Sequence, residues 1–537
     1  MKIIIIGAVA GGPSLATRLR RLDEDVDIIM FERGQHISFA SCGLPYYLGH
    51  VIKERDSLIE RTPEVLKEKN NIDVRIQTEV TAIDPEQKIV TATNLVDGST
   101  YTESYDKLIL ATGARPTVPK INGLTDATNL FTIRNVTDAD KISDFIETNH
   151  PHHVTIVGGG TAGIELAENF QLRGLTVSIV ERSEHVAAPF DPEITEILEK
   201  QLIKHKIDLH TNANVDKITE QGKSIHLSSG ETLKTDMLIF VTGVVPNSEL
   251  APAAKITLAP DKHIIVDEHL QTNVADIYAI GDVIETTSYI TGLPIQSVLS
   301  SAANRQGHLL ADALLGADLT YRGFIGAGVA QVFDMTVSYT GYTEQTLEAA
   351  GVMNYQSIFI TPFDHAYFYP NAKRLNLKVT YHPSTGAILG AQAIGHSGVD
   401  KRIGELSVAI TGNLTVHDLP DLELPYSPPY STTRDPLNTA GYVAINQLNQ
   451  ADSMVPLKEI PADDLKSAFF LAIHEDGKTN TGSITPNLSI PLNDLRDRLA
   501  EVPTNKKIYI THRPGLNNYT AARILAGHKY EVSIVEE

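Results

Sequence analysis

The stretch VTIVGGGTAGIELAENF, residues 154–170, decides the fold. A short apolar run ends at Gly158, and Gly160 and Gly163 complete the spacing GxGxxG before a helical pattern begins. In such a turn the first glycine permits a tight bend, the second lets a pyrophosphate approach the backbone, and the third lets helix and strand pack closely. The stretch therefore predicts a βαβ unit that binds a dinucleotide.

An acidic residue strengthens this prediction. The next apolar run, VSIVE, ends in Glu181, close to the distance of about 20 residues at which a ribose-binding acid follows such a turn. A carboxylate there accepts hydrogen bonds from ribose hydroxyls and repels a 2′-phosphate, which favours NADH over NADPH. Because Arg182 is adjacent and weakens the preference, NADPH remains an alternative.

The arrangement recurs at residues 2–32. KIIII is followed by GAVAGG and a helical pattern, and the second apolar run ends in Glu32. Val9 stands where the second glycine belongs, so this motif alone is ambiguous. In ADIYAIGDVIE, a strand closes on Gly281 and Asp282, and an acid at that place favours a polyol chain such as the ribityl of FAD. Two dinucleotide sites are implied.

Composition restricts the function classes. The chain has 537 residues, which suggests several domains, and Lys+Arg 45 against Asp+Glu 66 leaves a net charge of −21. Such an acidic surface disfavours nucleic acid and anionic membranes as partners. No apolar run is long enough to span a bilayer, and the first run stops at Gly7, too early for a secretory signal. We therefore expect a cytoplasmic protein.

The chain has a single cysteine, Cys42. It excludes an intramolecular disulfide, a CxxC pair and a cysteine-rich zinc site, and no other metal site is expected. A lone cysteine is more often an inert buried thiol. Here it follows Glu32 by ten residues and precedes GLP, so we expect it beside the first dinucleotide, at a helix N-terminus whose dipole lowers its pKa.

Several motifs carry a family resemblance: SFASCGLPYY, ATGARP, GGGTAGIELAE, YAIGD and YSPPYS. With them, residues 1 to about 447 resemble the single-cysteine FAD-dependent pyridine nucleotide-disulfide oxidoreductases, and most closely the coenzyme A disulfide and persulfide reductases with a C-terminal rhodanese domain. The NADH oxidases and peroxidases of this branch carry a histidine in the first glycine turn. Here that position is Ala10, which disfavours peroxide chemistry.

The resemblance implies an α/β protein with two nested Rossmann-like dinucleotide-binding domains, an α+β dimerisation domain and a C-terminal rhodanese-like α/β domain. The expected boundaries are 1–114 with 246–320 for FAD, 115–245 for NAD(H), 321–450 for dimerisation, a Pro-containing linker at 451–462, and the rhodanese-like domain at 463–537. Its catalytic cysteine position is occupied by His512 and its loop arginine by Asn517, although Arg513 is nearby. We expect a degenerate domain that serves as a scaffold.

The resemblance also implies the chemistry. NADH would reduce FAD, and FAD would reduce an oxidised Cys42, in which a small thiol such as coenzyme A is the bonding partner. The expected FAD-binding residues are Gly7, Ala10, Gly11, Gly12, Glu32, Arg33, Val80, Thr112, Gly113 and Asp282. Those for NADH are Gly158, Gly160, Thr161, Gly163, Glu181 and Gly243. Thr161 replaces an aromatic residue that often covers the flavin, so oxygen reduction is an open alternative.

Coenzyme A needs a local cationic site on so acidic a chain. By resemblance, Arg18 and Arg21 of the first helix hold its phosphates, with Ser38, Ser41 and Arg305 as further candidates. Without the resemblance, the arginines of the first helix are interpreted as a solvent-exposed basic face of that helix.

Tyrosines from the partner subunit of a homodimer are expected to complete the site. HAYFYP (365–370) and LPYSPPYS (424–431) correspond to the family's tyrosine segments, so Tyr426 and either Tyr367 or Tyr369 would act beside Cys42. A water-forming NADH oxidase that uses a cysteine sulfenic acid, and a flavin and thiol redox sensor, are the alternative functions.

Overall fold

The computed structural model describes residues 1–188, 190–449, 454–474, 484–511 and 515–536. It divides into two compact units. Unit 1 comprises Met1–Gly326 and Ala330–Phe333, and unit 2 comprises Ala327–Val329 and Asp334–Glu537. The expected boundaries between smaller domains remain predictions.

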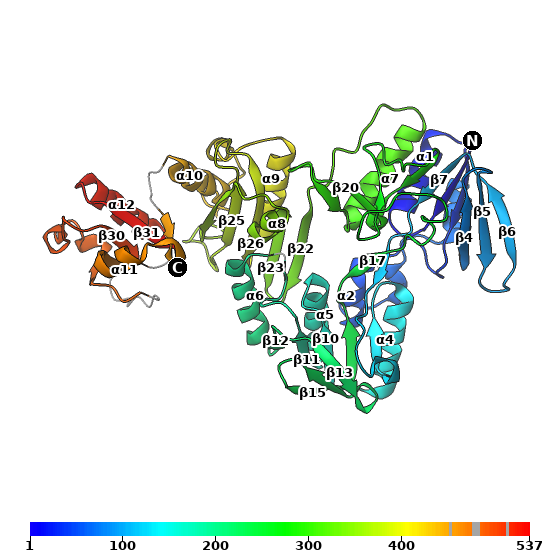
Figure 1. The fold of residues 1–537 in the computed structure, drawn as a ribbon, viewed down its shortest axis with the longest axis horizontal. Coiled ribbons are helices and arrows are strands. Elements are labelled where there is room, and N and C mark those ends of the chain that lie inside the picture. The colour runs from blue at the N-terminus through cyan, green and yellow to red at the C-terminus, as the bar shows by residue number, and fades with distance from the viewer. Residues whose placement is uncertain (189, 450–453, 475–483, 512–514, 537) are drawn as a thin grey trace. The chain divides into compact units, whose positions relative to one another are not determined.

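Unit 1 contains a sheet of five parallel strands in the order β19–β7–β1–β2–β3. Figure 1 labels its strand β7 and the helix α1. The central strand β1 of the sheet is apolar on both faces, as a parallel sheet covered by helices requires, and Ile3, Ile4 and Ile5 are fully buried. The strands are β1 (Lys2–Ile6), β2 (Asp27–Phe31), β3 (Asp73–Arg75), β7 (Lys107–Leu110) and β19 (Ile277–Ala279).

A second parallel sheet in unit 1 repeats this arrangement, in the order β12–β11–β10–β16–β9. Its strands are β9 (Leu130–Thr132), β10 (His153–Val157), β11 (Thr176–Val180), β12 (Asp208–His210) and β16 (Met237–Phe240). The helices α1 (Gly11–Leu22) and α5 (Thr161–Leu172) follow β1 and β10, so the two predicted βαβ units are confirmed.

The chain passes between the two sheets twice, at one place. Outgoing β8 (Ala114–Pro116) pairs antiparallel with returning β17 (Val244–Pro246), in the register Arg115 to Val245. These are the Pro-containing ends of KLILATGARP and MLIFVTGVVPN. The second sheet is therefore built from chain inserted into the first.

Smaller sheets and helices complete unit 1. The sheets are β4–β5–β6 (Thr78–Asp84, Ile89–Asn94, Thr100–Ser104), β13–β14–β15 (Val215–Thr219, Ser224–Leu227, Thr232–Lys234) and β18–β20–β21 (Ile264–Ile265, Ile284–Thr287, Pro294–Gln296). The remaining helices are α2 (Leu44–Leu48), α3 (Pro63–Asn70), α4 (Val136–Asn149), α6 (Pro192–Lys204) and α7 (Ser300–Leu314). Helix α7 packs on α1, and a Cβ at Gly307 would lie 2.5 Å from the Gly11 carbonyl oxygen.

The sheet β22–β23–β26–β25–β24 lies mostly in unit 2 and is the strand-rich α+β part that the sequence predicts. Its pairs β23–β26, β26–β25 and β25–β24 are antiparallel. The strands are β22 (Ala327–Val332), β23 (Met335–Gly341), β24 (Gln356–Ile360), β25 (Asn376–Tyr381) and β26 (Ile388–Gly395). Its helices are α8 (Glu344–Ala349), α9 (Val399–Thr411) and α10 (Pro436–Leu448), and α9 packs on β23 and β26.

Unit 2 ends in a five-stranded parallel sheet, β27–β31–β30–β28–β29. The strands are β27 (Met454–Pro456), β28 (Phe469–His474), β29 (Leu488–Pro491), β30 (Ile508–Thr511) and β31 (Val532–Glu536), with helices α11 (Ala462–Ser467) and α12 (Leu516–Gly527). Its α/β character agrees with the rhodanese-like expectation. The predicted His512 and Arg513 lie outside the described residues.

One stretch differs from the expectation of a linker at 451–462. Within it, β27 pairs in parallel with β31, from Met454 opposite Ile534 onward, and forms the edge of the sheet. Three residues are too few for the sequence pattern to predict a strand. They form one because their backbone pairs with the edge that β31 would otherwise leave open. None of the helices in the described ranges is long and apolar enough to cross a membrane.

Arg20 is a buried arginine that closes the end of α1. Its Nε donates to the Asn70 carbonyl oxygen at 2.9 Å and one Nη donates to Val26 at 2.6 Å, while only 3% of the residue is exposed. Its Nη1 also donates to the carbonyl oxygen of Asp23, the C-cap of α1, at 3.2 Å, so the guanidinium satisfies carbonyl oxygens at the ends of both α1 and α3.

We expect Arg20→Met to lower the free energy of unfolding of unit 1 by about 2 kcal/mol, because buried carbonyl oxygens lose their donors. Urea unfolding followed by circular dichroism measures this. Arg21→Met, on the same helix but exposed, is the matched control and should cost less than about 0.5 kcal/mol. Equal losses in both variants would contradict the assignment.

Candidate active site

The two glycine turns are sterically closed at their first and third glycines. A Cβ at Gly7, where φ is 109°, would lie 2.1 Å from the Ala111 carbonyl oxygen, and one at Gly12 would lie 2.0 Å from that of Gly7. In the second turn, a Cβ at Gly158 would lie 2.5 Å from the Val241 carbonyl oxygen, and one at Gly163 would lie 2.0 Å from that of Gly158. Only glycine fits these four positions, so each turn has the tight strand-to-helix junction of a dinucleotide site.

An acidic residue lies at each turn, as the sequence predicts. Glu32 accepts hydrogen bonds from the backbone N–H of Ala8 at 3.0 Å and of Gly34 at 2.7 Å. Glu181 accepts from Gly159 at 2.7 Å and Ser183 at 2.8 Å. The two carboxylates therefore have equivalent backbone partners and are fixed beside the residue that follows the first glycine.

The space at the turns fits the pyrophosphate of a dinucleotide. Neither α1 nor α5 has a side chain that caps its first N–H groups, so these donors face the turn. A Cβ at Gly160 would meet no atom within 4 Å, which leaves the backbone open to a ligand. Thr161, the first residue of α5, is exposed beside it. The residues present fit two dinucleotides, one at each turn.

The cysteine segment is attached to the first turn. Ser38 donates its backbone N–H to the Ala8 carbonyl oxygen at 2.8 Å, and Cys42 follows in a short 3-10 turn, Ser41–Gly43, with its side chain exposed. The expected helix N-terminus is present but weak, because α2 has only five residues and its macrodipole is correspondingly small. The expected effect of a helix dipole on the thiol therefore has little structural basis.

A cluster of acids near this segment is not predicted by the sequence analysis. The Tyr46 hydroxyl donates to Glu165 of α5 at 3.4 Å, and Glu168 accepts from the backbone N–H of Phe333 at 2.9 Å. Burial raises the pKa of Glu165 to about 7, the Tyr46 hydrogen bond opposes this, and the negative charge of Glu168 adds to it. Burial and the same two carboxylates raise the pKa of Tyr46 to about 12, with a smaller contribution from Cys42.

Other residues predicted at the FAD site have partners within the protein. Asp282 forms an ion pair with Arg134 at 2.6 Å, and Thr112 donates its hydroxyl to the Asn247 carbonyl oxygen at 2.7 Å. Arg33 lies 3.7 Å from Glu79 across an exposed surface. The remaining FAD positions hold backbone or apolar side chains: Ala10 is the N-cap of α1, Gly11 is buried in α1, Val80 is buried in β4, and Gly113 adopts positive φ. Gly243, predicted at the NADH site, also adopts positive φ.

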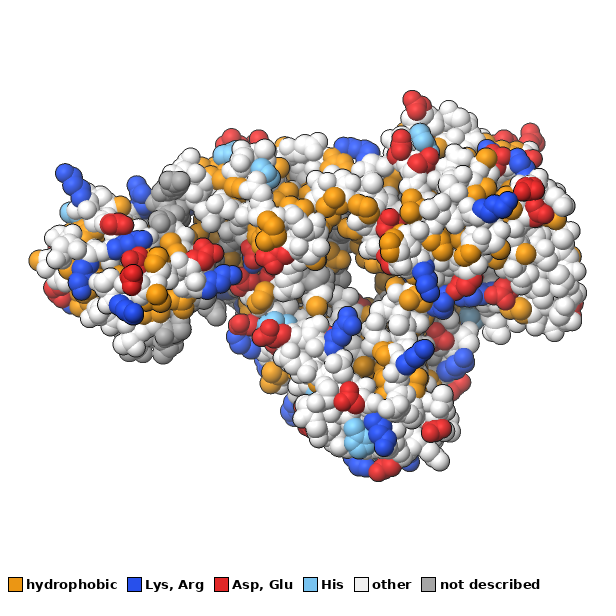
Figure 2. Space-filling model, viewed as in Figure 1, with side chains coloured by type: hydrophobic (Ala, Val, Ile, Leu, Met, Phe, Trp, Pro, Cys, Tyr) orange, Lys and Arg blue, Asp and Glu red, His pale blue; other side chains and the backbone are white. Residues whose placement is uncertain are grey.

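The residues predicted to bind coenzyme A are partly dispersed. Arg18 forms an ion pair with Asp312 of α7 at 2.6 Å, while Arg21 is exposed at the end of α1. Arg305 is exposed and lies over the Tyr321 ring at 5.8 Å. Ser38 is buried with φ at 43°, and Ser41 is half-buried beside Cys42. Figure 2 shows Lys and Arg interspersed with Asp and Glu on the viewed face.

Unit 2 brings the predicted tyrosines together on two segments. We name residues 364–370 the first tyrosine segment and residues 424–431 the second. The Ala366 backbone N–H donates to the Pro428 carbonyl oxygen at 3.2 Å, which joins them. Their aromatic side chains are exposed: Tyr367 75%, Phe368 66%, Tyr369 42%, Tyr426 44% and Tyr430 73%. Because large exposed aromatic groups mark interaction surfaces, these segments are suited to contact another molecule.

Comparison with known proteins assigns the family. Residues 1–307 match the family model described as pyridine nucleotide-disulphide oxidoreductase, and residues 329–436 match the dimerisation domain of that family. The chain belongs to the pyridine nucleotide-disulphide oxidoreductases. This confirms the family resemblance, and the fold class that it implied, for the described sheets.

Three relatives illustrate the similarity. The coenzyme A disulfide reductase of Staphylococcus aureus (strain JH9) is 36% identical over 444 residues, 82% of this chain and 99% of the relative. The crystal structure of reduced Bacillus anthracis CoADR-RHD has a TM-score of 0.97 at 43% identity, over 100% of this chain and 96% of that one. A NAD-dependent persulfide reductase from A. fulgidus has a TM-score of 0.92 at 32% identity, over 100% and 99%.

The pKa of Glu165 makes stability depend on pH. Its value of about 7 in the folded protein is higher than the ordinary 4.5, so the folded state binds the proton more tightly than the unfolded state does. Stability therefore falls as pH rises from about 4.5 to about 7 and stays low above that, because the buried carboxyl must ionise.

We expect Glu165→Gln to remove this loss, because the amide cannot ionise. In thermal unfolding of the protein without NADH, the stability of the variant relative to the wild type should increase from pH 5 to pH 8, by on the order of 2 kcal/mol. A difference that stays constant over this range, or increases toward acid, would contradict the raised pKa.

Proposed function

We propose that the protein is a flavoprotein reductase that passes electrons from NADH through FAD to Cys42 and reduces coenzyme A disulfide, or a persulfide or polysulfide of coenzyme A. The observation that carries this proposal is the attachment of the Cys42 segment to the first glycine turn through Ser38 and Ala8. It keeps an exposed thiol in the segment that adjoins a dinucleotide turn. The names of the S. aureus and A. fulgidus relatives support the sulfur substrates.

The lone thiol determines the chemistry of the oxidative step. The Cys42 thiolate attacks one sulfur of the substrate disulfide, so a bond from Cys42 to that sulfur forms as the original S–S bond breaks and one thiolate leaves. When bound, FAD and NADH supply the two electrons that cleave the mixed disulfide and release the second thiol. Since the chain has a single cysteine, the bonding partner of Cys42 must come from the substrate.

Unit 1 supplies the residues that bind the cofactors. In this proposal FAD is held by the first glycine turn with Glu32 and Asp282, and NADH by the second with Glu181. The other FAD residues are Gly7, Ala10, Gly11, Gly12, Arg33, Val80, Thr112 and Gly113, and the other NADH residues are Gly158, Gly160, Thr161, Gly163 and Gly243. Arg18, Arg21 and Arg305 bind the phosphates of coenzyme A, aided by Ser38 and Ser41.

Unit 2 supplies the partner's contribution. We propose a homodimer in which Tyr426 and one of Tyr367 and Tyr369 act beside the Cys42 of the other subunit. A phenol there donates its proton to the thiolate that leaves, and so lowers the barrier to disulfide cleavage. The exposure of these side chains and the match to the family's dimerisation domain support this arrangement. The rhodanese-like domain is proposed to be a scaffold.

A second function is favoured by one observation, the exposed Thr161 where a flavin-covering aromatic residue is often found. It would let oxygen reach the reduced cofactor, as in a water-forming NADH oxidase with a sulfenic acid at Cys42. Oxygen consumed in proportion to NADH, with no thiol released, would favour this function. A redox sensor would show no useful turnover with the purified protein alone.

We expect Cys42→Ser to abolish thiol production from NADH and coenzyme A disulfide while the protein keeps its yellow colour. The oxygen of serine does not form the mixed disulfide, whereas the glycine turns are unchanged. Thiol release is measured with a chromogenic disulfide, and intact mass before and after reductant tests for bound coenzyme A. Ser57→Ala, at an exposed position outside the proposed sites, is the control. Normal turnover by Cys42→Ser would refute the proposal.

We expect NADH to be preferred over NADPH because Glu181 repels a 2′-phosphate. Glu181→Ser should raise the ratio of kcat/KM for NADPH to that for NADH by about tenfold or more. Glu184→Ser removes the same charge from an exposed position in the same loop and is the matched control. If the ratio of kcat/KM for NADPH to that for NADH were equal in the two variants, Glu181 would not discriminate between the two cofactors at the ribose.

A further inference from the structure

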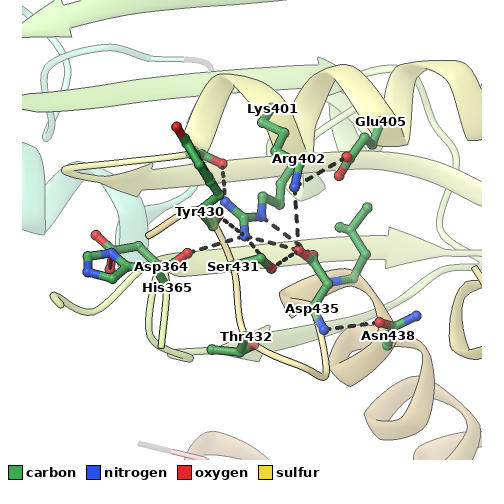
Figure 3. A network of polar contacts seen from close by, with 12 residues as sticks. Asp364, His365, Lys401, Arg402, Glu405, Tyr430, Ser431, Thr432, Asp435 and Asn438 are labelled. Atoms are coloured by element: carbon green, nitrogen blue, oxygen red, sulfur yellow. Dashed lines mark hydrogen bonds and ion pairs between the residues drawn. The ribbon is translucent and has the colours of Figure 1, made fainter. Parts of the chain in front are cut away.

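Arg402 of α9 is a fully buried cation behind the two tyrosine segments. One of its nitrogens, Nη2, lies 3.0 Å from Asp435 Oδ2, 3.1 Å from Ser431 Oγ and 3.2 Å from the Asp364 carbonyl oxygen (Figure 3). The same nitrogen lies 3.4 Å from the Tyr430 carbonyl oxygen. A single guanidinium nitrogen therefore contacts both segments, Asp364 in the first and Tyr430 and Ser431 in the second.

The surroundings of Arg402 are shaped around its guanidinium. Gly398, with φ at 65°, accepts from Nη1 at 3.2 Å, and a Cβ at this position would lie 1.9 Å from Nη1. Asp435, which faces the guanidinium, also accepts from the Leu437 N–H and caps α10. The arginine thus connects α9, α10 and both tyrosine segments.

Each tyrosine segment has little support of its own. The first is the tip of the β24–β25 hairpin, closed by Asp364 and Lys373 and by a contact of 3.2 Å from His365 to the Pro370 carbonyl oxygen. The second is an irregular stretch before α10, and its side chains Tyr426 and Tyr430 are exposed. Together with the hydrogen bond from Ala366 to Pro428, Arg402 joins the two segments, because it contacts Asp364 in the first and Tyr430 and Ser431 in the second.

Burial of this ion pair is not explained by stability alone. Taking a guanidinium and a carboxylate out of water costs several kcal/mol each, and apolar residues of similar volume often stabilise a core as well. What arginine provides is geometry, because Nε, Nη1 and Nη2 of Arg402 donate from one rigid plane to acceptors on different segments, whereas lysine carries its three donors on one nitrogen at the end of a flexible stem.

We infer that Arg402 is a positioning residue: it holds the two tyrosine segments in register, so that their phenols reach the Cys42 of the partner subunit. The inference rests on the proposed function, since it requires that the tyrosines act across a dimer. Arg402 itself touches no substrate, and its effect on catalysis is expressed through the neighbouring subunit.

The test uses Arg402→Lys, which keeps the charge opposite Asp435 but loses the fork. Its rate of thiol production is expected to fall about tenfold, because small displacements of a positioned group cost about that much or more. Lys401→Met is the matched control: Lys401 is adjacent on α9 and lies 3.8 Å from Asp435. Its rate is expected to stay within twofold of the wild type.

Heterodimers separate action across the interface from action within a subunit. Differently tagged chains are co-expressed and purified over both tags. The trans dimer pairs a Cys42→Ser chain with an Arg402→Lys chain, so its one working thiol meets tyrosines supported by an intact Arg402. The cis dimer carries both substitutions on one chain, so the working thiol of the wild-type chain meets tyrosines without that support.

The trans dimer is expected to keep about half of the wild-type rate per dimer, and the cis dimer about a tenth of that half. The opposite order would show that Arg402 acts in its own subunit, and equal rates would show a general structural effect or none. Each of these results overturns the inference. A Cys42→Ser homodimer that still produces thiol would instead overturn the proposed function.

Thermal unfolding of every dimer checks that the rates are compared between folded proteins. If Arg402→Lys does not yield folded protein, Ser431→Ala replaces it in the same cis and trans dimers. That change removes one acceptor of Nη2 and leaves the charge pair intact, so a smaller loss in the same order is expected. Absence of that order with Ser431→Ala would overturn the inference.

Discussion

The rest of the structure depends on the junction at which each glycine turn meets a carboxylate from the next strand. At the first junction, Glu32 binds the N–H that follows Gly7, and at the second, Glu181 binds the N–H that follows Gly158. At each junction this hydrogen bond holds the end of the second strand (β2 or β11) against the turn that leads from the first strand (β1 or β10) into its helix. Because the two junctions are equivalent, the two cofactor sites of the proposed function share the same arrangement of glycine turn, helix and carboxylate.

The sequence predicts this part of the molecule well because the signal is local. Strand, glycine spacing and terminal acid lie within about 30 residues, and steric closure at Gly12 and Gly163 leaves no other residue for those positions. The attachment of the cysteine segment to the first turn also agrees with the sequence analysis, whereas the short length of the helix that follows is not given by the sequence. The strand β27 is not predictable, since its three residues form a strand only by pairing with β31.

Long-range polar contacts are the part that sequence reasoning misses. The pKa of Glu165 depends on Tyr46, more than a hundred positions earlier, and on burial that no local pattern shows. For Arg402 a signal exists: it lies three residues after Val399 and four before Leu406, on the buried stripe of α9. A charged residue on such a stripe indicates a partner in the core, but the sequence does not name Asp435 as that partner.

The ribbon formed by β8 and β17 has an evolutionary consequence. Its two strands carry the chain out to the inserted sheet and back, and Ala114 lies opposite Pro246 at the base. An insertion whose ends are neighbours leaves the host sheet closed whatever its contents. In the proposed function this inserted lobe binds NADH. On that proposal, recombination at the ribbon would change the electron donor without rebuilding the domain that receives the electrons.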